Sequence, residues 1–212
     1  MRSIAKTLPD SRPALLWWAL ALGALSVLVA QGVLAPLDQQ LAGWVAALRS
    51  PMLDGPMRTL TWFGGSTWTL LGVSGLSALA WRRGGGAAVR MPWLAFLLGA
   101  VIEVLLRVSV AQWRPDTTAL PPAMDAMTRF ELAGFPSGHA FRSAFVFGWL
   151  AVEARGWPRA GWWRALCLVM TALVGFTRVY LNRHWATDVA GAWLVVLTTV
   201  AMARWWEQRR HA

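Results

Sequence analysis

Six long apolar segments separated by polar or basic stretches dominate the sequence. They cover about residues 14–35, 60–81, 91–110, 137–154, 162–180 and 186–206. An apolar segment of about 20 residues can cross a bilayer as a helix. In that form it satisfies all its own backbone polar groups. The pattern therefore predicts an all-α fold, a polytopic membrane helix bundle with six transmembrane helices, in a single domain over residues 1–212.

The first apolar segment has two interpretations. Arg2, Lys6 and Arg12 precede it, as basic residues precede the core of a signal peptide. Its apolar run is longer than the usual signal core of about 7–15 residues. The sequence therefore favours an uncleaved span.

Residues 36–59 mix charged and apolar positions. Their apolar residues recur at helical spacing and are Leu37, Leu41, Trp44, Val45 and Leu48. This spacing predicts one short helix that lies in the membrane interface or packs on the spans. The glycine-rich start of the second span, residues 62–65, indicates close helix packing or a wall of a substrate groove. Residues 115–135 form the longest polar stretch and are expected to be a loop with at most a short surface helix.

The composition supports a membrane protein. Hydrophobic residues make up 57% of the chain and charged residues only 14%. The 16 Trp residues agree, because Trp is enriched at bilayer interfaces. The net charge of +10 would suggest a nucleic-acid partner in a soluble protein, but here most of it lies in loops and sets the topology. The single cysteine, Cys167, is expected to pack among apolar neighbours.

The basic residues also predict an orientation. Six spans place both termini on one side, and twelve of the 20 Lys and Arg residues then fall on that side. Three of the eight on the opposite side belong to the polar motifs described next. Because cytoplasmic loops carry the excess of basic residues, we expect cytoplasmic termini, a bacterial inner membrane and a site that faces the periplasm.

Three polar motifs lie at the ends of the last four spans, and such groups are costly beside lipid. They are Arg107 with Arg114-Pro115, then residues 136–139 (Pro-Ser-Gly-His), then Arg178 with His184 and Asp188. Glu103 and Arg107, one turn apart, are expected to pair. If the helix continues, Arg107 and Arg114 lie on one side of it, although Pro115 limits its length.

Each motif also has a simpler explanation. His184 and Asp188 alone could equally be a capping pair, and Ser137-Gly138 alone would be an ordinary helix start. Together the motifs indicate a phosphate site. An arginine can bind phosphate oxygens through two parallel hydrogen bonds, and a helix N-terminus offers free N–H groups to an anion. The nearby acids do not form a metal-ligand cluster, so no metal and no cofactor is expected.

Taken in order, the motifs resemble the type 2 phosphatidic acid phosphatase family, which shares its site with vanadium haloperoxidases. The resemblance covers about residues 60–206. The matching residues are Arg107, Arg114, Pro115, Pro136, Ser137, Gly138, His139, Arg178, His184 and Asp188. Two positions depart from the family pattern, with Arg107 in place of the commoner Lys and Thr177 in place of Ser, and both keep the charge or the hydroxyl.

This resemblance implies a catalytic set and a substrate class. His184 would be the nucleophile that forms a phosphohistidine, Asp188 its orienting partner and His139 the general acid. Arg107, Arg114, Ser137, Gly138 and Arg178 would bind the phosphate. The expected partner is a lipid phosphate or diphosphate, such as undecaprenyl diphosphate, phosphatidic acid, phosphatidylglycerol phosphate or a lipid A phosphate.

Several alternatives stay open at this point. Arg142, Asn182 and Arg183 lie outside the family pattern. They are expected to reach toward the interface rather than to bind a second phosphate or headgroup. The enzyme could transfer the phosphate to another lipid instead of to water, or the cluster could bind an anion without chemistry. A soluble haloperoxidase conflicts with the spans, and the sequence predicts no oligomeric state.

Overall fold

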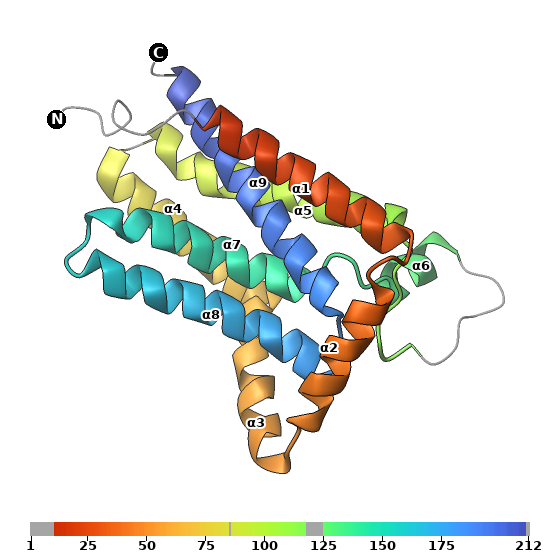
Figure 1. Cartoon of the computed structure of the whole chain (residues 1–212). Helices are drawn as coiled ribbons and strands as arrows, with labels where there is room; N and C mark the ends of the chain where they lie inside the picture. Colours follow the sequence, from red (N-terminus) through yellow and green to blue (C-terminus); the bar gives the residue numbers. More distant parts are fainter. Residues whose placement is uncertain (1–10, 85, 118–124, 211–212) are drawn as a thin grey trace.

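The computed structural model describes residues 11–84, 86–117 and 125–210. The basic residues Arg2 and Lys6, Gly85 and part of the long polar loop lie outside this range. Apart from an isolated bridge between Trp113 and Ala133, regular structure in the described residues is helical. The elements are α1 Arg12–Ala30, α2 Ala35–Ala47, α3 Pro51–Leu60, η2 Thr61–Gly64, α4 Ser66–Gly84, α5 Gly86–Ser109, α6 Ala126–Leu132, α7 Gly138–Glu153, η3 Ala154–Gly156, α8 Ala160–Tyr180 and α9 Ala186–Arg210 (Figure 1).

All six predicted apolar segments are helices, and the all-α fold class is confirmed. Four of these helices are long and apolar enough to cross a membrane, namely α1, residues 88–109 of α5, α8 and α9. The other two differ for physical reasons. Helix α7 has only 16 residues, and α4 is not apolar enough over the length of a span, because Ser, Thr and Gly interrupt its apolar residues and Arg82 and Arg83 follow them.

The sequence predicted that the first span ends near residue 35, which is about one turn too late. Helix α1 stops at Ala30, and Gly32 adopts a φ of +71°, a left-handed conformation that glycine reaches without steric cost. The chain then turns into α2, whose first turn contains Pro36.

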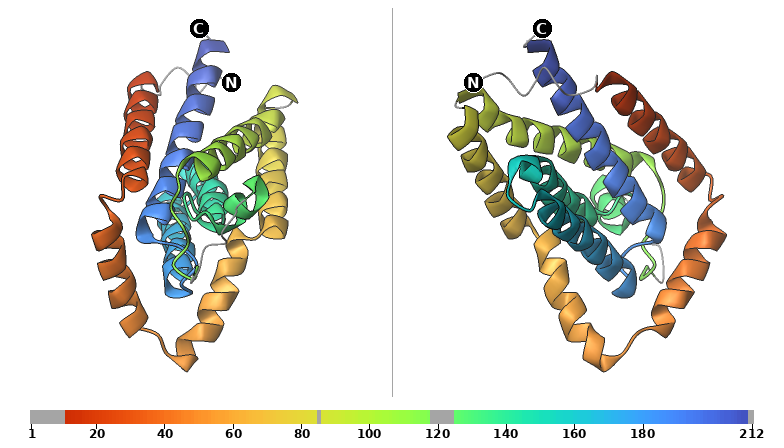
Figure 2. Two further views of the ribbon diagram at one scale, coloured as in Figure 1. Left: turned by 90° about the vertical axis from the view of Figure 1, so that its right-hand side faces the viewer. Right: turned by 60° about the vertical axis from the view of Figure 1, so that its left-hand side comes forward.

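Residues 36–59 form two helices where the sequence predicted one. Helices α2 and α3 meet at a break near Ser50 and make a V that projects from the bundle (Figure 2). In the apolar stripe Leu37, Trp44 and Leu48 are exposed, whereas Leu41 and Val45 are partly buried, and α2 contacts α8 and α9. Asp38 points inward and is 1% exposed.

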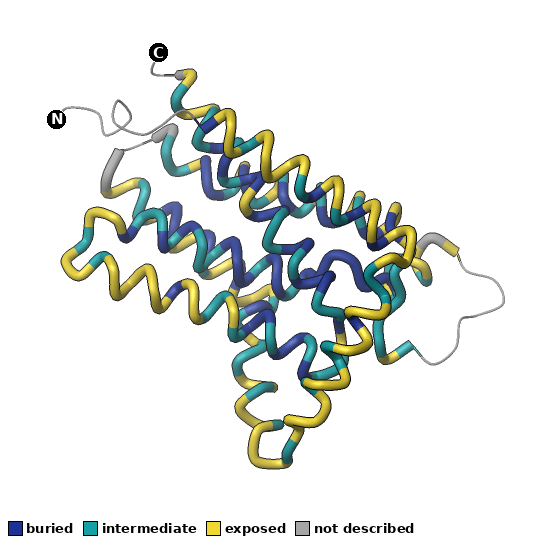
Figure 3. Tube along the Cα trace, in the orientation of Figure 1, coloured by how far each residue is buried: buried dark blue, intermediate teal, exposed yellow. Residues whose placement is uncertain are grey.

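Helices α7 and α9 form the centre of the bundle, with buried residues along both (Figure 3). Helix α7 packs against α8 and α9, while α1 lies on the outside against α9. An aromatic column holds α5 to α7: Phe96 stacks on Phe141 at a centroid distance of 5.6 Å, and its ring edge meets Phe145 at 5.4 Å.

The helix ends define two ends of the bundle. Ser11 N donates to Gln208 Oε1 at 3.1 Å, which places the start of α1 beside the end of α9. At the other end, Ser137 N donates to the Asp188 carbonyl at 3.0 Å, which joins the starts of α7 and α9. Helix α5 stops at Ser109 and does not continue to Arg114, so the condition under which Arg107 and Arg114 would lie on one side of a helix is not met. Arg114 lies in the following loop, where its N–H donates to the Leu132 carbonyl at 3.2 Å.

Close packing at Gly191 gives a test of this core. A Cβ added there would lie 2.6 Å from Cζ of Phe135, a fully buried ring with no room to shift. We expect Gly191→Ala to lower the free energy of unfolding by about 1–3 kcal/mol, the usual cost of overpacking. The matched control is Gly148→Ala, whose Cβ would meet only Val196 at 3.8 Å. Thermal unfolding in detergent measures both, and equal stability of the two variants would contradict this packing.

Candidate active site

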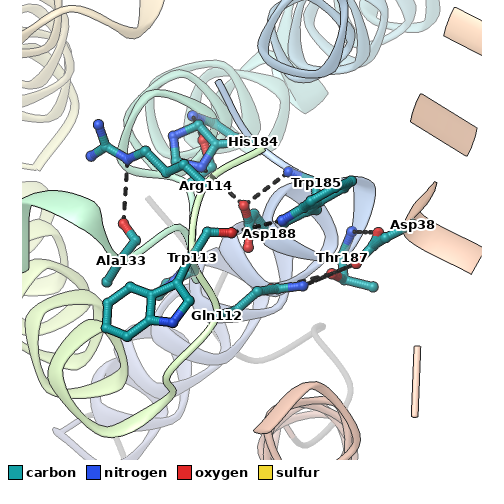
Figure 4. A network of polar contacts seen from close by, with 12 residues as sticks. Asp38, Gln112, Trp113, Arg114, Ala133, His184, Trp185, Thr187 and Asp188 are labelled. Carbon is teal, nitrogen blue, oxygen red and sulfur yellow. Dashed lines mark hydrogen bonds and ion pairs between the residues drawn. The ribbon is translucent and has the colours of Figure 1, made fainter. Parts of the chain in front are cut away.

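His184 and Asp188 meet in the turn between α8 and the first turn of α9. His184 Nδ1 lies 3.1 Å from Asp188 Oδ2, and the two side chains are 4% and 0% exposed (Figure 4). The same oxygen accepts the Trp185 N–H at 2.9 Å. Asp188 therefore caps the start of α9 and also orients the His184 ring. The interpretation of the pair as a helix cap and its interpretation as part of a phosphate site are thus compatible.

The main chain before His184 is fixed by the end of α8. The Arg178 carbonyl accepts the N–H groups of Arg183 at 3.0 Å and His184 at 3.2 Å. Asn182 reverses the chain with a φ of 57°, which suits a helix C-terminal turn. Arg183 is exposed and forms an ion pair with Asp116 at 2.7 Å.

His184 is held in its neutral form. Burial lowers the pKa of its imidazole well below the ordinary value, and the positive charges of Arg178, Arg114 and Arg107 lower it further. In the neutral ring Nδ1–H donates to the Asp188 carboxylate, so Nε2 keeps its lone pair. A neutral imidazole with a free Nε2 is a nucleophile at ordinary pH.

The second histidine, His139, carries its proton on the other ring nitrogen, Nε2. An Arg142 terminal N–H group (Nη2) lies 3.3 Å from its Nδ1, and Arg142 Nε donates to the Gly64 carbonyl at 2.8 Å. A guanidinium can only donate, so Nδ1 of His139 must accept and Nε2 carries the proton. Arg142 therefore contacts His139 directly, whereas the sequence favoured a side chain that reaches toward the interface.

Ser137 and Gly138 begin α7. Ser137 is the N-cap, and its Oγ accepts the Ala140 N–H at 3.4 Å. A Cβ on Gly138 would lie 2.8 Å from Glu103 Oε1 and 3.3 Å from an Arg107 nitrogen, so a larger residue there would displace the ends of these two paired side chains. The start of α7 thus lies directly against the charged side chains of α5.

The three arginines predicted to bind phosphate come from three different segments. Arg107 of α5 donates to Glu103 at 2.7 Å, which confirms the expected pair, and to the Pro136 carbonyl at 3.0 Å. Arg178 of α8 donates to Thr61 at 2.8 Å, and loop residue Arg114 donates to the Ala133 carbonyl at 3.4 Å. Among the residues that the structure describes, the buried Nε of Arg107 and of Arg178 has no hydrogen-bond partner. These donors suit an oxyanion.

Comparison with known proteins agrees with this geometry. The PAP2 superfamily profile matches residues 89–212, more than half of the chain. The chain belongs to the PAP2 superfamily.

Two solved structures share the fold. The transmembrane PAP2-type phosphatidylglycerolphosphate phosphatase of Bacillus subtilis superposes with a TM-score of 0.71 at 20% identity, over 93% of this chain and 94% of that one. LpxE of Aquifex aeolicus gives a TM-score of 0.57 at 22% identity, over 77% of this chain and 93% of that one. The first match extends over the N-terminal region outside the PAP2 profile.

Sequence reasoning missed a buried polar network beside the PAP2 site. The Asp38 carboxylate accepts the Thr187 N–H at 3.0 Å, the Thr187 hydroxyl, and the Gln112 side-chain N–H at 3.0 Å (Figure 4). This network ties α2 to the first turn of α9, next to Asp188. The one available signal was an acid within an otherwise apolar helical pattern.

Two glycines of the PAP2 site were also not predicted as site residues. A Cβ on Gly134 would lie 2.7 Å from Asp188 Oδ2, and one on Gly64 would lie 2.8 Å from the His139 Cβ. Both are contacts between distant segments. Gly64 lies in the glycine-rich stretch 62–65, for which the sequence indicated close helix packing or a wall of a substrate groove, whereas no local pattern marks Gly134. In the described ranges no three His, Cys, Asp or Glu side chains are grouped as metal ligands would be.

The two histidines should carry opposite tautomers. In ¹⁵N-histidine-labelled protein at neutral pH, we expect His184 to be protonated only at Nδ1 and His139 only at Nε2. Because the pKa of His184 is lowered, its ring should stay neutral as the pH falls through the ordinary histidine range near about 6.5. Asp188→Asn should remove the tautomer preference of His184, and Arg142→Gln that of His139. A cationic His184 at neutral pH would contradict the geometry.

Proposed function

We propose that the protein is a membrane lipid phosphatase that hydrolyses phosphomonoester or diphosphate bonds through a phosphohistidine at His184. One observation carries the proposal: a buried, neutral His184 with Nδ1 bound to Asp188 lies within the field of three arginines. This arrangement joins a nucleophile, its orienting group and cationic phosphate ligands at one place.

The first step is the transfer of phosphate to the enzyme. His139 gains a second proton when the phosphate binds and releases it again when inorganic phosphate leaves. Nε2 of His184 attacks phosphorus, the bond from phosphorus to the lipid oxygen breaks, and that oxygen takes a proton from the His139 imidazolium. Arg107, Arg114 and Arg178 stabilise the charge that develops on the equatorial oxygens. The N–H groups at the start of α7, near Ser137 and Gly138, add the positive end of a helix dipole.

The second step releases phosphate. His139 removes a proton from water, the water oxygen bonds to phosphorus, and the bond from phosphorus to Nε2 of His184 breaks. Inorganic phosphate leaves and the enzyme returns to its starting state. The reaction consumes one water and needs no metal, because the arginines provide the positive charge that a metal ion would provide.

Arg142 controls the proton on His139. In the free enzyme its contact with Nδ1 favours the neutral ring. The negative charge of a bound phosphate raises the proton affinity of nearby groups. His139 then becomes an effective acid only when substrate is present. Arg183 and Asn182 have structural roles, as an exposed ion pair and a helix-terminal turn.

The proposed topology has six spans, with α4 and α7 crossing the membrane beside the four longer helices. Both termini are cytoplasmic and the site faces the periplasm of a bacterial inner membrane. The charge bias of the loops supports this orientation, as does the position of the site at the end of the bundle opposite the start of α1 and the end of α9.

The substrate is a lipid phosphate, because the site lies at helix ends, where headgroups lie. Phosphatidylglycerol phosphate is a first candidate, since the Bacillus subtilis protein of the same fold is named for that activity. Undecaprenyl diphosphate, phosphatidic acid and lipid A phosphates complete the candidate set. Transfer of the phosphate to a second lipid is the alternative that uses the same intermediate.

Phosphate release from a lipid panel tests this function. We expect the purified protein to release inorganic phosphate from at least one lipid, with chelator present and no metal added. His184→Ala should lower the rate by at least about a thousand-fold, as the loss of a nucleophile does. His211→Ala, which changes the third histidine of the sequence, is the matched control.

Three outcomes would contradict the proposal. Loss of activity with chelator would mean that a metal is required. Lipid turnover without inorganic phosphate would identify a transferase. No turnover of any lipid, with retained anion binding, would identify a binding protein.

A further inference from the structure

A second arginine cluster lies at the end of the bundle opposite His184. It lines a cavity of about 340 Å³ between α1, α7, α8 and α9. Its cationic residues are Arg155 of η3, Arg164 of α8 and Arg204 of α9. None of them belongs to the PAP2 motifs or to the proposed mechanism.

The cavity walls are apolar and open onto the outer surface of the bundle. Trp18, Leu168 and Leu197 line it, and all three are exposed, at 37%, 61% and 40%. On a helix bundle in a membrane such side chains face lipid. The cavity therefore combines an apolar entrance with cationic groups, which is the chemistry of a phospholipid and not of a free ion.

The described part of the chain leaves the arginines of the cavity incompletely paired. Among the described residues, a buried terminal nitrogen of Arg204, Nη2, has no hydrogen-bond partner, and an unpaired buried donor is costly. Glu153 and Glu207 attract Arg204 and Arg155 repels it, but no acidic residue within the described ranges lines the cavity. In the described part of the chain Arg155 and Arg164 form no ion pair. An anion would satisfy all three groups.

We infer that this cavity binds the phosphodiester headgroup of an anionic phospholipid, with the lipid's acyl chains along the groove between α1 and α8. Guanidinium groups bind phosphate oxygens through paired hydrogen bonds. Basic pockets between helices at the cytoplasmic face bind such headgroups. In the proposed orientation the lipid belongs to the cytoplasmic leaflet, so it is a structural ligand and not a substrate.

The position of the cavity suggests what the lipid does. Helix α1 packs mainly on α9, and most of its remaining surface is exposed. The cavity joins α1 to α7 and α8, which α1 otherwise barely contacts. A bound lipid would therefore hold α1 to the bundle, and its removal should loosen that helix first.

The test uses full-length protein in detergent, with phosphatidylglycerol as the probe and phosphatidylcholine as the zwitterionic control. We expect phosphatidylglycerol to raise the melting temperature and to remain bound in native mass spectrometry, while phosphatidylcholine does neither. Arg155→Gln with Arg164→Gln should weaken the apparent Kd by at least about ten-fold. Both residues are exposed, so this variant should fold. Arg82→Gln, an exposed arginine in the last turn of α4, is the matched control.

Three results would overturn the inference. An unchanged phosphatidylglycerol effect in the double variant would mean that the lipid binds elsewhere. Loss of the effect in Arg178→Gln, with the double variant unaffected, would place the lipid in the catalytic site. Equal stabilisation by inorganic phosphate alone would show a simple anion site, with no role for the apolar groove.

Discussion

The buried carboxylate of Asp188 fixes the geometry on which the rest of the site depends. It accepts hydrogen bonds from His184 Nδ1 and from the Trp185 main chain, while its own carbonyl binds the start of α7. One residue thus sets the position of His184, the proposed nucleophile, relative to the start of α7. The carboxylate is costly to bury, and Gly134 and the Asp38 network hold the chain closely around it.

The arginines of the site bring a second electrostatic cost, because several positive charges lie close together with little water between them. Glu103 offsets part of this repulsion through its ion pair with Arg107, and it also lies against Gly138. Within the described residues, Nε of Arg107 and of Arg178 has no hydrogen-bond partner. In the proposed mechanism the substrate phosphate completes the charge balance of the site. Substrate binding and stabilisation of the transition state would then have the same electrostatic origin.

Much of this arrangement could be predicted from the sequence. The apolar segments located all six long helices, because burial in lipid demands long apolar runs that are visible locally. The ordered motifs identified His184, His139 and Asp188, and the structure brings His184 and Asp188 into contact. The spacing of residues within the motifs therefore sufficed to predict that these side chains lie together. Their catalytic roles remain predictions.

The remainder depends on contacts between distant segments. The inward orientation of Asp38 follows from its hydrogen bonds to Thr187 of α9, and the apolar stripe of α2 gave no sign of it. Helix α1 ends at Ala30, just before Gly32 takes a left-handed conformation. Arg114 reaches the site from a loop paired with residues 132–134, so helical spacing from Arg107 was misleading. Gly64 and Gly134 matter only because His139 and Asp188 lie against them.

The most direct measurement is to trap the covalent intermediate. The wild-type protein, mixed with a lipid phosphate substrate and quenched rapidly in alkali, should carry phosphate on the peptide that contains His184. The bond should survive alkali and break in acid, as a phosphoramidate does, and it should be absent from His184→Ala. Phosphate on another residue, or turnover with no covalent phosphate at any quench time, would contradict the central role of His184.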